Sequence, residues 1–184
     1  MQPTEILIEE HRVIQRVLTA LEKAASRLSR GEEVYLRFFN GTSTLIHGFT
    51  DNYHHKKEEQ ILVPFLVANG MPRDKDPVAA MLAEHEEGRQ LAHRLKLATE
   101  RFQSGDISAR DQVVLSALAY VSLVRRHITN EETNLFPLVE KIVPPDRQAE
   151  MLAAFAQFEQ KEHGSEVREK YYGMADRLMQ ECLR

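Results

Sequence analysis

The chain is 184 residues long, which is the size of one domain and leaves no room for a second. Its net charge of −4 gives no basic surface of the kind that binds nucleic acid or anionic membranes. The one cysteine, Cys182, excludes a disulfide framework and a thiolate zinc site, and it suits the reducing cytoplasm, where we expect the protein. The longest nearly apolar stretch, Val113 to Val124, is shorter than the roughly 20 residues of a spanning helix, so we expect no membrane segment.

Apolar residues recur at three- and four-residue spacing nearly throughout, and only 8 glycines and 7 prolines interrupt them, which predicts an all-α fold. Helical segments are expected, in chain order, over residues 4–31, 33–67, 76–104, 108–143 and 146–183. Thr4 and Asp76 stand where N-terminal caps are expected, and Gly31 stands where glycine commonly ends a helix. The short connections predict an up-down-up-down four-helix bundle over about 4–143 with an additional C-terminal helix, all in a single domain over 1–184.

Two segments of the chain resemble each other more closely than amphipathic helices require. Residues 54–64 and 127–137 align without gaps, and five positions match. The matched pairs are His54 with His127, Glu58 with Glu131, Glu59 with Glu132, Leu62 with Leu135, and Pro64 with Pro137. Upstream, residues 7–11 match residues 81–85, and each of these segments ends in a histidine. We infer a helical hairpin that is used twice, so that the two halves can face each other across an approximate two-fold axis.

Six polar residues of this repeat are expected to point into the bundle, namely His11, His54, Glu58, His85, His127 and Glu131. Residues four apart lie on one face of a helix, so each His-x-x-x-Glu pair can face a single cavity. Left unpaired in an apolar core, such groups would cost roughly 1–3 kcal/mol each, and a metal ion removes that cost. Imidazole and carboxylate together suit iron, manganese or zinc, and two carboxylates that can bridge suit a pair of ions.

The other histidines and the adjacent glutamates are expected outside this set. His55 lies about 100° around the helix from its neighbour, so we expect its side chain to be partly solvated. His93 and His163 have no counterpart in the other half and are expected at the surface. Glu59 and Glu132 directly follow the predicted ligands and are expected beside the site, where either could orient a neighbouring side chain.

Three further positions are expected near the site without binding the metal, namely His47, Tyr53 and Tyr120. His47 lies seven residues before His54 on the same helix face, as Tyr120 does before His127. Seven residues span about 10 Å along a helix, which is too far for direct ligation. We expect these side chains to support the ligands or to line an access channel, with simple core packing as the alternative.

The order His11, His54-x-x-x-Glu58, His85, His127-x-x-x-Glu131 resembles the haemerythrin-like, or HHE cation-binding, family. The segments at 54–64 and 81–89 are similar to its bacterial branch, and the resemblance covers residues 4 to about 140. It implies a four-helix bundle that holds a non-haem di-iron centre. The resemblance also implies that the four imidazoles bind two iron ions, which Glu58 and Glu131 bridge together with a water-derived or oxo bridge.

The sequence departs from the oxygen-carrying haemerythrins in two respects. Those proteins carry two histidines four residues apart on the third helix, whereas Met81 and Arg89 stand at that spacing from His85. They also end with His-x-x-x-x-Asp, whereas this chain has His-x-x-x-Glu. The set therefore lacks a fifth histidine, and a coordination position can be open or water-filled. This argues against simple oxygen carriage and leaves room for reaction with oxygen, peroxide or nitric oxide.

Two functions follow from this resemblance. The first is a protein that binds or senses a small diatomic or peroxide ligand, such as oxygen or nitric oxide, and we expect this non-enzymatic role. The alternative is a di-iron enzyme or repair protein that reduces nitric oxide or peroxide, or that donates iron to damaged iron–sulfur clusters. A ferritin-like oxidase would need Glu three residues before a histidine, which no histidine here has. The duplicated polar set argues against a purely structural bundle.

Overall fold

The structure, a computed structural model, describes residues 2–163 and 166–182, and these residues form helices and short connections without a strand. The elements in chain order are α1 (Pro3–Ser29), α2 (Leu36–Leu45), η1 (Ile46–His55), η2 (Glu58–Leu62), α3 (Val63–Ala68), α4 (Val78–Gln103), η3 (Ile107–Ala109), α5 (Arg110–Asn130), η4 (Glu131–Leu135), α6 (Phe136–Ile142), α7 (Pro145–Phe158), η5 (Glu159–His163) and α8 (Val167–Glu181). The element η3 is a 3₁₀ turn, and the other elements labelled η are π-helical.

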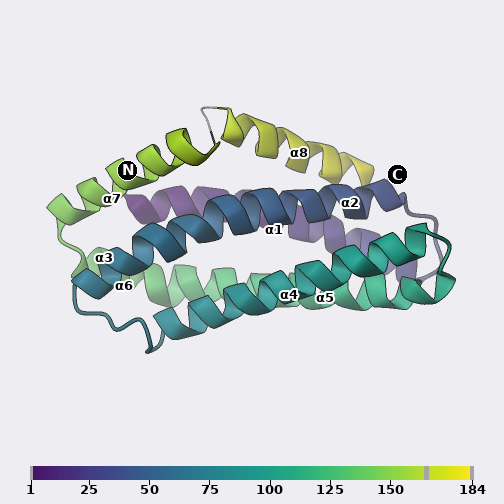
Figure 1. The fold of residues 1–184 in the computed structure, drawn as a ribbon, viewed down its shortest axis with the longest axis horizontal. Coiled ribbons are helices and arrows are strands. Elements are labelled where there is room, and N and C mark those ends of the chain that lie inside the picture. Colours follow the sequence, from purple (N-terminus) through teal and green to yellow (C-terminus); the bar gives the residue numbers. More distant parts are fainter. Residues whose placement is uncertain (1, 164–165, 183–184) are drawn as a thin grey trace.

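Four helical runs form the bundle, as Figure 1 shows. The first is α1, the second extends from α2 to α3, the third is α4, and the fourth extends from α5 to α6. Successive runs are antiparallel, and α5 packs against both α1 and α4. The predicted all-α class and the up-down-up-down bundle are therefore confirmed.

The helix ends differ in part from the predictions. Gly31 has a φ of +77° directly after α1, as expected for a glycine that ends a helix. The predicted cap at Thr4 is wrong, because α1 begins at Pro3 and the buried Thr4 hydroxyl donates to Glu140 Oε1 on α6 at 2.9 Å. The predicted cap at Asp76 is also wrong, because α4 begins at Val78 without a side-chain cap.

The C-terminal segment was predicted as one helix over about 146–183, and in the described residues it is two helices, α7 and α8, with η5 extending α7. Both lie along the outer side of α1 (Figure 1), and α8 also contacts α2. Residue 183 lies outside the described residues. Met151 and Phe155 of α7, and Tyr171 and Leu178 of α8, are buried. The C-terminal segment therefore contributes to the core of the protein.

The two repeated segments share a local departure from α-helical geometry. Pro64 and Pro137 lie inside long helical runs, where proline lacks an N–H and its ring clashes with the carbonyl four residues earlier. In each half a π-helical turn, η2 or η4, directly precedes the helix that contains the proline, and it begins at the glutamate of the repeat, Glu58 or Glu131. The wider turn allows the run to continue past the proline. Such π turns are frequent at functional sites.

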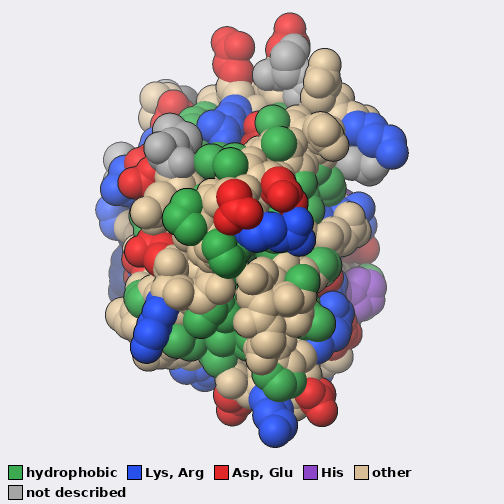
Figure 2. All heavy atoms as spheres, turned by 90° about the vertical axis from the view of Figure 1, so that its left-hand side faces the viewer, with side chains coloured by type: hydrophobic (Ala, Val, Ile, Leu, Met, Phe, Trp, Pro, Cys, Tyr) green, Lys and Arg blue, Asp and Glu red, His purple; other side chains and the backbone are tan. Residues whose placement is uncertain are grey.

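The hydrophobic core is divided into two clusters by a layer of buried polar residues. The larger cluster includes Leu18 and Leu21 of α1, and the smaller one includes Leu66 of α3 and Val139 of α6. On the first three runs the chain passes from one cluster to the other at a buried histidine, and on the fourth it does so at Glu131, since Ile128 still belongs to the larger cluster. The end of the bundle near α3, α6 and α7 presents hydrophobic and charged side chains, and histidine appears only at its edge (Figure 2). The polar layer is thus covered at this end.

One helical run of the described residues, Ile107–Ile142, is long enough and apolar enough to cross a membrane, with a mean hydropathy of 1.3 over 18 residues. About 44% of that window is buried inside the bundle, and the run carries His127 and Glu131 into the interior. A core helix passes the same test, so this run is weak evidence for a membrane segment.

Helix α8 approaches η1 closely at a glycine. A Cβ atom on Gly48 would lie 2.8 Å from Tyr171 Cζ and 2.9 Å from Tyr171 Cε1, which is closer than real contacts allow. The Tyr171 ring also packs against Phe49, at 5.5 Å between ring centroids, so it has little freedom to move away. The packing of α8 therefore depends on the absence of a side chain at residue 48.

We predict that Gly48→Ala lowers the free energy of unfolding by about 1–3 kcal/mol, because the added methyl overpacks the interface with α8. The matched control is Gly173→Ala on α8 itself, where a Cβ would meet only Arg177 Nη1 at 3.7 Å. Urea denaturation measures both variants. Equal stability of the two variants would show that α8 does not pack as described.

Candidate metal centre

The six residues of the predicted set lie together inside the bundle, and each is at most 2% exposed. They come from all four helical runs, because the register of the repeat brings the two halves to the same level. Two groups of residues place ligand atoms within 4.8 Å of one another. The first group is His11, His54, Glu58 and Glu131, and the second is His55, Glu58, His85 and His127.

Glu58 contacts an imidazole from each half of the repeat. Its Oε1 lies 3.4 Å from His54 Nε2, and its Oε2 lies 3.2 Å from His85 Nε2. Glu131 also contacts an imidazole from each half, but through a single oxygen, since its Oε2 lies 3.2 Å from His11 Nε2 and 3.3 Å from His127 Nε2. Each carboxylate therefore lies between one histidine of its own half and one of the other half, which is where a carboxylate shared by two cations must lie.

Most inward-facing atoms of this layer lack ordinary hydrogen bonds within the described part of the chain, although His11 Nε2 and His54 Nε2 lie 3.1 Å apart, within hydrogen-bond distance of each other. Both carboxylate oxygens of Glu58 and of Glu131, and Nε2 of His85 and of His127, are buried without a hydrogen-bond partner. Buried polar atoms left in this way cost about 1–3 kcal/mol each. All of these atoms are metal-ligand types, so the residues present fit one or more metal ions.

The outward-facing nitrogen of each of the four imidazoles meets a carboxylate. The pairs, measured from Nδ1 to oxygen, are His11–Glu132 at 2.9 Å, His54–Glu10 at 2.9 Å, His85–Glu59 at 2.8 Å and His127–Glu84 at 3.1 Å. An Nδ1–H that donates to a carboxylate fixes the ring and leaves Nε2 free to bind a metal. All four imidazoles are thus oriented in the same way.

Glu59 and Glu132 take the orienting role that the sequence left open for them. Glu10 and Glu84 were not predicted, although each directly precedes a histidine of the predicted set in both halves. Each of these two glutamates accepts a hydrogen bond from a histidine of a neighbouring run rather than from the histidine beside it in sequence. Glu10 pairs with His54, and Glu84 pairs with His127. Reasoning from one helix at a time cannot find such pairs, but the repeated Glu-His dipeptide is a signal that could have done so.

Charge interactions in the layer are strong. Burial lowers the pKa of His11 and His85, but the carboxylates beside them outweigh this effect and raise the two pKa values to about 10 and about 9. Burial raises the pKa of Glu58, but the nearby histidines hold it well below its ordinary value. The carboxylates therefore favour positive charge in the layer, and a metal ion must displace protons to bind there.

The prediction for His55 is wrong. Its side chain is 3% exposed rather than partly solvated, and its ring stacks on His85 with 3.8 Å between centroids. The physical reason is that α4 packs against η1, so the helix face that carries His55 is also interior. His93 is exposed, as expected, and the side chain of His163 lies outside the described residues.

His47 is exposed, which excludes core packing, and the amide of Asn52 donates to its backbone carbonyl at 2.7 Å. It lines a polar groove of about 880 Å³ that also reaches Asp51 and Glu59.

Tyr53 is buried below the Lys57 ammonium, which lies 3.8 Å from the centre of its ring. None of these contacts is with one of the six predicted ligands.

Tyr120 is buried in the larger hydrophobic cluster. Burial and the nearby Asp51 carboxylate raise the pKa of its hydroxyl well above the ordinary value, so the side chain stays neutral. Its expected role in supporting a ligand remains a prediction.

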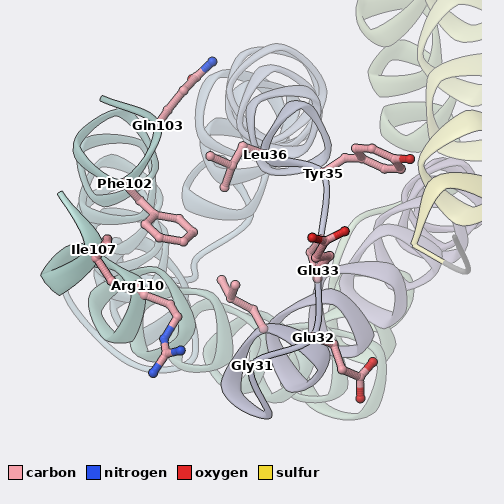
Figure 3. A pocket seen from close by; sticks show the side chains of 11 residues that line it. Gly31, Glu32, Glu33, Tyr35, Leu36, Phe102, Gln103, Ile107 and Arg110 are labelled. Atoms are coloured by element: carbon pink, nitrogen blue, oxygen red, sulfur yellow. The ribbon is translucent and has the colours of Figure 1, made fainter. Parts of the chain in front are cut away.

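A second cavity, of about 690 Å³, lies at the far end of α1 from His11. Figure 3 shows Phe102 and Leu36 pointing into it, whereas the side chains of Glu32 and Tyr35 point away. It does not share a lining residue with the polar layer.

The C-terminal segment is connected to the polar layer through a fully buried lysine. The Lys57 ammonium contacts the Glu10 carboxylate, which accepts from His54 Nδ1, and it lies 3.2 Å from Glu159 Oε1 of η5. Arg168 of α8 donates to the same Glu159 oxygen at 3.1 Å and to the Tyr53 hydroxyl at 3.2 Å. Charged contacts therefore connect Arg168 and Glu159 of the C-terminal segment, through Lys57 and Glu10, to the predicted ligand His54.

We predict that Lys57→Met lowers the free energy of unfolding by about 3–5 kcal/mol, because it leaves the Glu10 carboxylate buried without its cation. Lys56→Met is the matched control, since Lys56 is only half-buried and precedes Lys57 directly. Chemical denaturation of the metal-free protein measures both. An effect of Lys57→Met no larger than that of Lys56→Met would contradict the described charge network.

Comparison with known proteins agrees with this geometry. Residues 2–139 match the sequence model of the family described as Hemerythrin HHE cation binding domain. Uncharacterized proteins of Mycobacterium bovis and of two Mycobacterium tuberculosis strains are 27% identical over 160 residues. The match covers 87% of this chain but only 62% of the length of those relatives. No solved structure matches the chain.

Proposed function

Because the chain belongs to the hemerythrin HHE cation-binding family, we propose that it holds two iron ions in the polar layer and binds or senses oxygen, nitric oxide or a related reactive species. One ion would lie with His11 and His54, and the other with His85 and His127. Glu58 and Glu131 would bridge the pair. The donor atoms alone would also suit manganese or zinc, and the family resemblance is what favours iron.

The observation that carries this proposal is the placement of the two glutamates. Each touches one imidazole of both halves, at 3.2 to 3.4 Å, and all four of their oxygens are buried without hydrogen bonds in the described residues. A single ion bound by one half would leave the other half's donors unsatisfied. Two ions, one for each pair of histidines, satisfy the donors of both halves.

A bound pair of iron ions supplies a redox-active centre that can take a small diatomic or peroxide ligand. The residues of the chain hold and enclose that centre. The four outer carboxylates fix the imidazole rings, and the hydrophobic clusters on both sides exclude bulk water. Because the six proposed ligands are at most 2% exposed, only a small molecule can reach them without a rearrangement of the bundle. This enclosure supports a diatomic or peroxide ligand.

We predict two irons per chain after expression with iron supplied, together with near-ultraviolet absorption from a bridged ferric pair. His54→Ala and His127→Ala should each lose at least one iron and the absorption, because each removes a ligand of a different ion. His93→Ala, at an exposed histidine on α4, is the control and should keep both. Full iron content in His54→Ala and His127→Ala would show that the ligand assignment is wrong.

The outer carboxylates provide a separate test. Glu59→Gln and Glu132→Gln should each weaken iron affinity by about 10–100-fold, because the amide orients the ring less strongly and lowers the basicity of the imidazole. Glu86→Gln is the matched control, since Glu86 is exposed and pairs with Arg89. Competition with a chelator measures the affinities. Equal affinities in all three variants would contradict the orienting role of Glu59 and Glu132.

Anaerobic titration of the iron-loaded protein with nitric oxide or oxygen distinguishes binding from catalysis. Saturation at a fixed number of molecules per chain, without continued consumption, is expected for binding or sensing. Sustained turnover of nitric oxide or peroxide with a supplied reductant would instead favour the enzymatic alternative.

A further inference from the structure

The outer face of α5 carries apolar side chains that the described part of the chain leaves exposed. Leu115 is 68% exposed and Leu118 is 37% exposed, and Ile107 of η3, directly before the helix, is 76% exposed. Helices α7 and α8 lie on the side of α1 and α2, whereas α4 and α5 lie on the opposite side (Figure 1). The most apolar window of the run Ile107–Ile142 is accordingly only 44% buried. The bundle itself therefore leaves much of this apolar surface in contact with water.

The outer face of α4, on the same side of the bundle, is different because it is charged. Its exposed side chains include Glu86, Glu87, Arg94, Lys96, Glu100 and Arg101. By contrast, α5 has no charged residue between Asp111 and Arg125, which is a distance of about three turns. A contiguous exposed apolar surface of this kind indicates a contact site.

The order of residues along this face of α5 fits a second copy of the same helix. Leu115, Leu118, Ala119 and Ser122 are all exposed, and their three- and four-residue spacing puts them on one face. In a two-fold contact, both copies use the same surface. With the two helices antiparallel and the axis between residues 118 and 119, Leu118 lies opposite Ala119 and Leu115 lies opposite Ser122. Each large side chain thus meets a small one, which allows the two helices to interdigitate.

The same register places opposite charges at both ends of the contact. Asp111 of each copy lies opposite Arg126 of the other. Their side chains are 79% and 58% exposed, so both are accessible from outside the bundle. Within the chain, Asp111 Oδ1 lies 3.5 Å from Arg110 Nε, and Arg126 Nε lies 3.2 Å from Glu84 Oε1. Complementary charges at the edge of a contact favour one register and disfavour others.

We propose that α5 forms a two-fold antiparallel contact with α5 of a second copy of this chain, so that the protein is a homodimer. The contact does not depend on the proposed iron ions, because the six predicted ligands are buried away from this face. A lipid surface fits the face less well, since Asp111 and Ser122 lie on it and helices on membrane surfaces carry basic side chains beside large apolar ones. One helix buries only a small area against its copy, so we expect a reversible dimer.

Sedimentation velocity of the full chain, from micromolar to millimolar concentration, tests the contact. We expect a monomer–dimer equilibrium in the unaltered protein. Leu115→Glu and Leu118→Glu should each weaken the dimer by at least about 10-fold, because each puts two carboxylates into an otherwise uncharged contact. The matched control is Leu97→Glu, at a leucine of α4 that is 45% exposed, and it should dimerise as the unaltered protein does. Circular dichroism checks that the variants fold, and Leu118→Ser replaces any glutamate variant that does not.

Thiol crosslinking tests the direction of the contact, in a Cys182→Ser background that removes the one native cysteine. Ala119→Cys lies at the axis and should crosslink to its own copy through a short bismaleimide. Gln112→Cys lies about 10 Å along the helix from the axis, so its two copies would be about 20 Å apart and should not crosslink. Equal crosslinking of both variants would indicate parallel helices and reject the proposed register.

Two further outcomes would overturn the proposal. A monomer at every concentration would reject it, and binding of that monomer to phosphatidylcholine vesicles would show that the face meets lipid instead. A dimer that Leu115→Glu and Leu118→Glu leave unchanged would show that the chain associates through another surface. The iron content of the protein tests the proposed function separately and does not bear on this contact.

Discussion

The carboxylates of Glu58 and Glu131 are the constraint on which the rest of the structure depends. Both are buried between two hydrophobic clusters, and their oxygens lack hydrogen bonds in the described part of the protein. An ionised group in such a place is costly unless cations face it from several directions. The four histidine rings face the two carboxylates from different helices. The two proposed iron ions would neutralise the negative charge of the carboxylates. The long helices, the π turns before Pro64 and Pro137, and the repeated sequence all serve to bring these groups to one level.

The polar layer is surrounded by further carboxylates and one buried lysine. Glu10 connects His54 to Lys57, and Lys57 in turn contacts Glu159 in the C-terminal segment. The helices that follow the four-helix bundle therefore contribute to the electrostatics of the centre as well as to the core. Helix α8 holds Arg168 against Glu159. A change in the packing of α8 would therefore alter the contacts of Lys57 and Glu10, and through them the position of the predicted ligand His54.

The sequence was sufficient for the fold class and for placing the six residues of the repeat together in the interior, because both depend on periodicity and on a pattern that occurs twice; that these residues bind metal stays a prediction. The sequence failed where the outcome depends on contacts between helices. The side chain of His55 was expected to be partly solvated from its angle on one helix, and only the packing of α4 against η1 makes that face interior. Glu10 and Glu84 were missed for the same reason, since each orients a histidine on a neighbouring run. The division of the C-terminal segment into α7 and α8 likewise has no strong signal in its weak apolar pattern.

The most direct test of the account is the thermal unfolding of metal-free protein during an anaerobic titration with ferrous iron. If the buried carboxylates need two cations, iron binds the folded state in preference to the unfolded state, and each site adds about 2.7 kcal/mol when free iron reaches 100 times its dissociation constant. We predict that the unfolding temperature rises with added iron and goes on rising with the free iron concentration, while bound iron levels off at two per chain. An unfolding temperature that does not change with iron would contradict the central claim that this layer is built to hold metal.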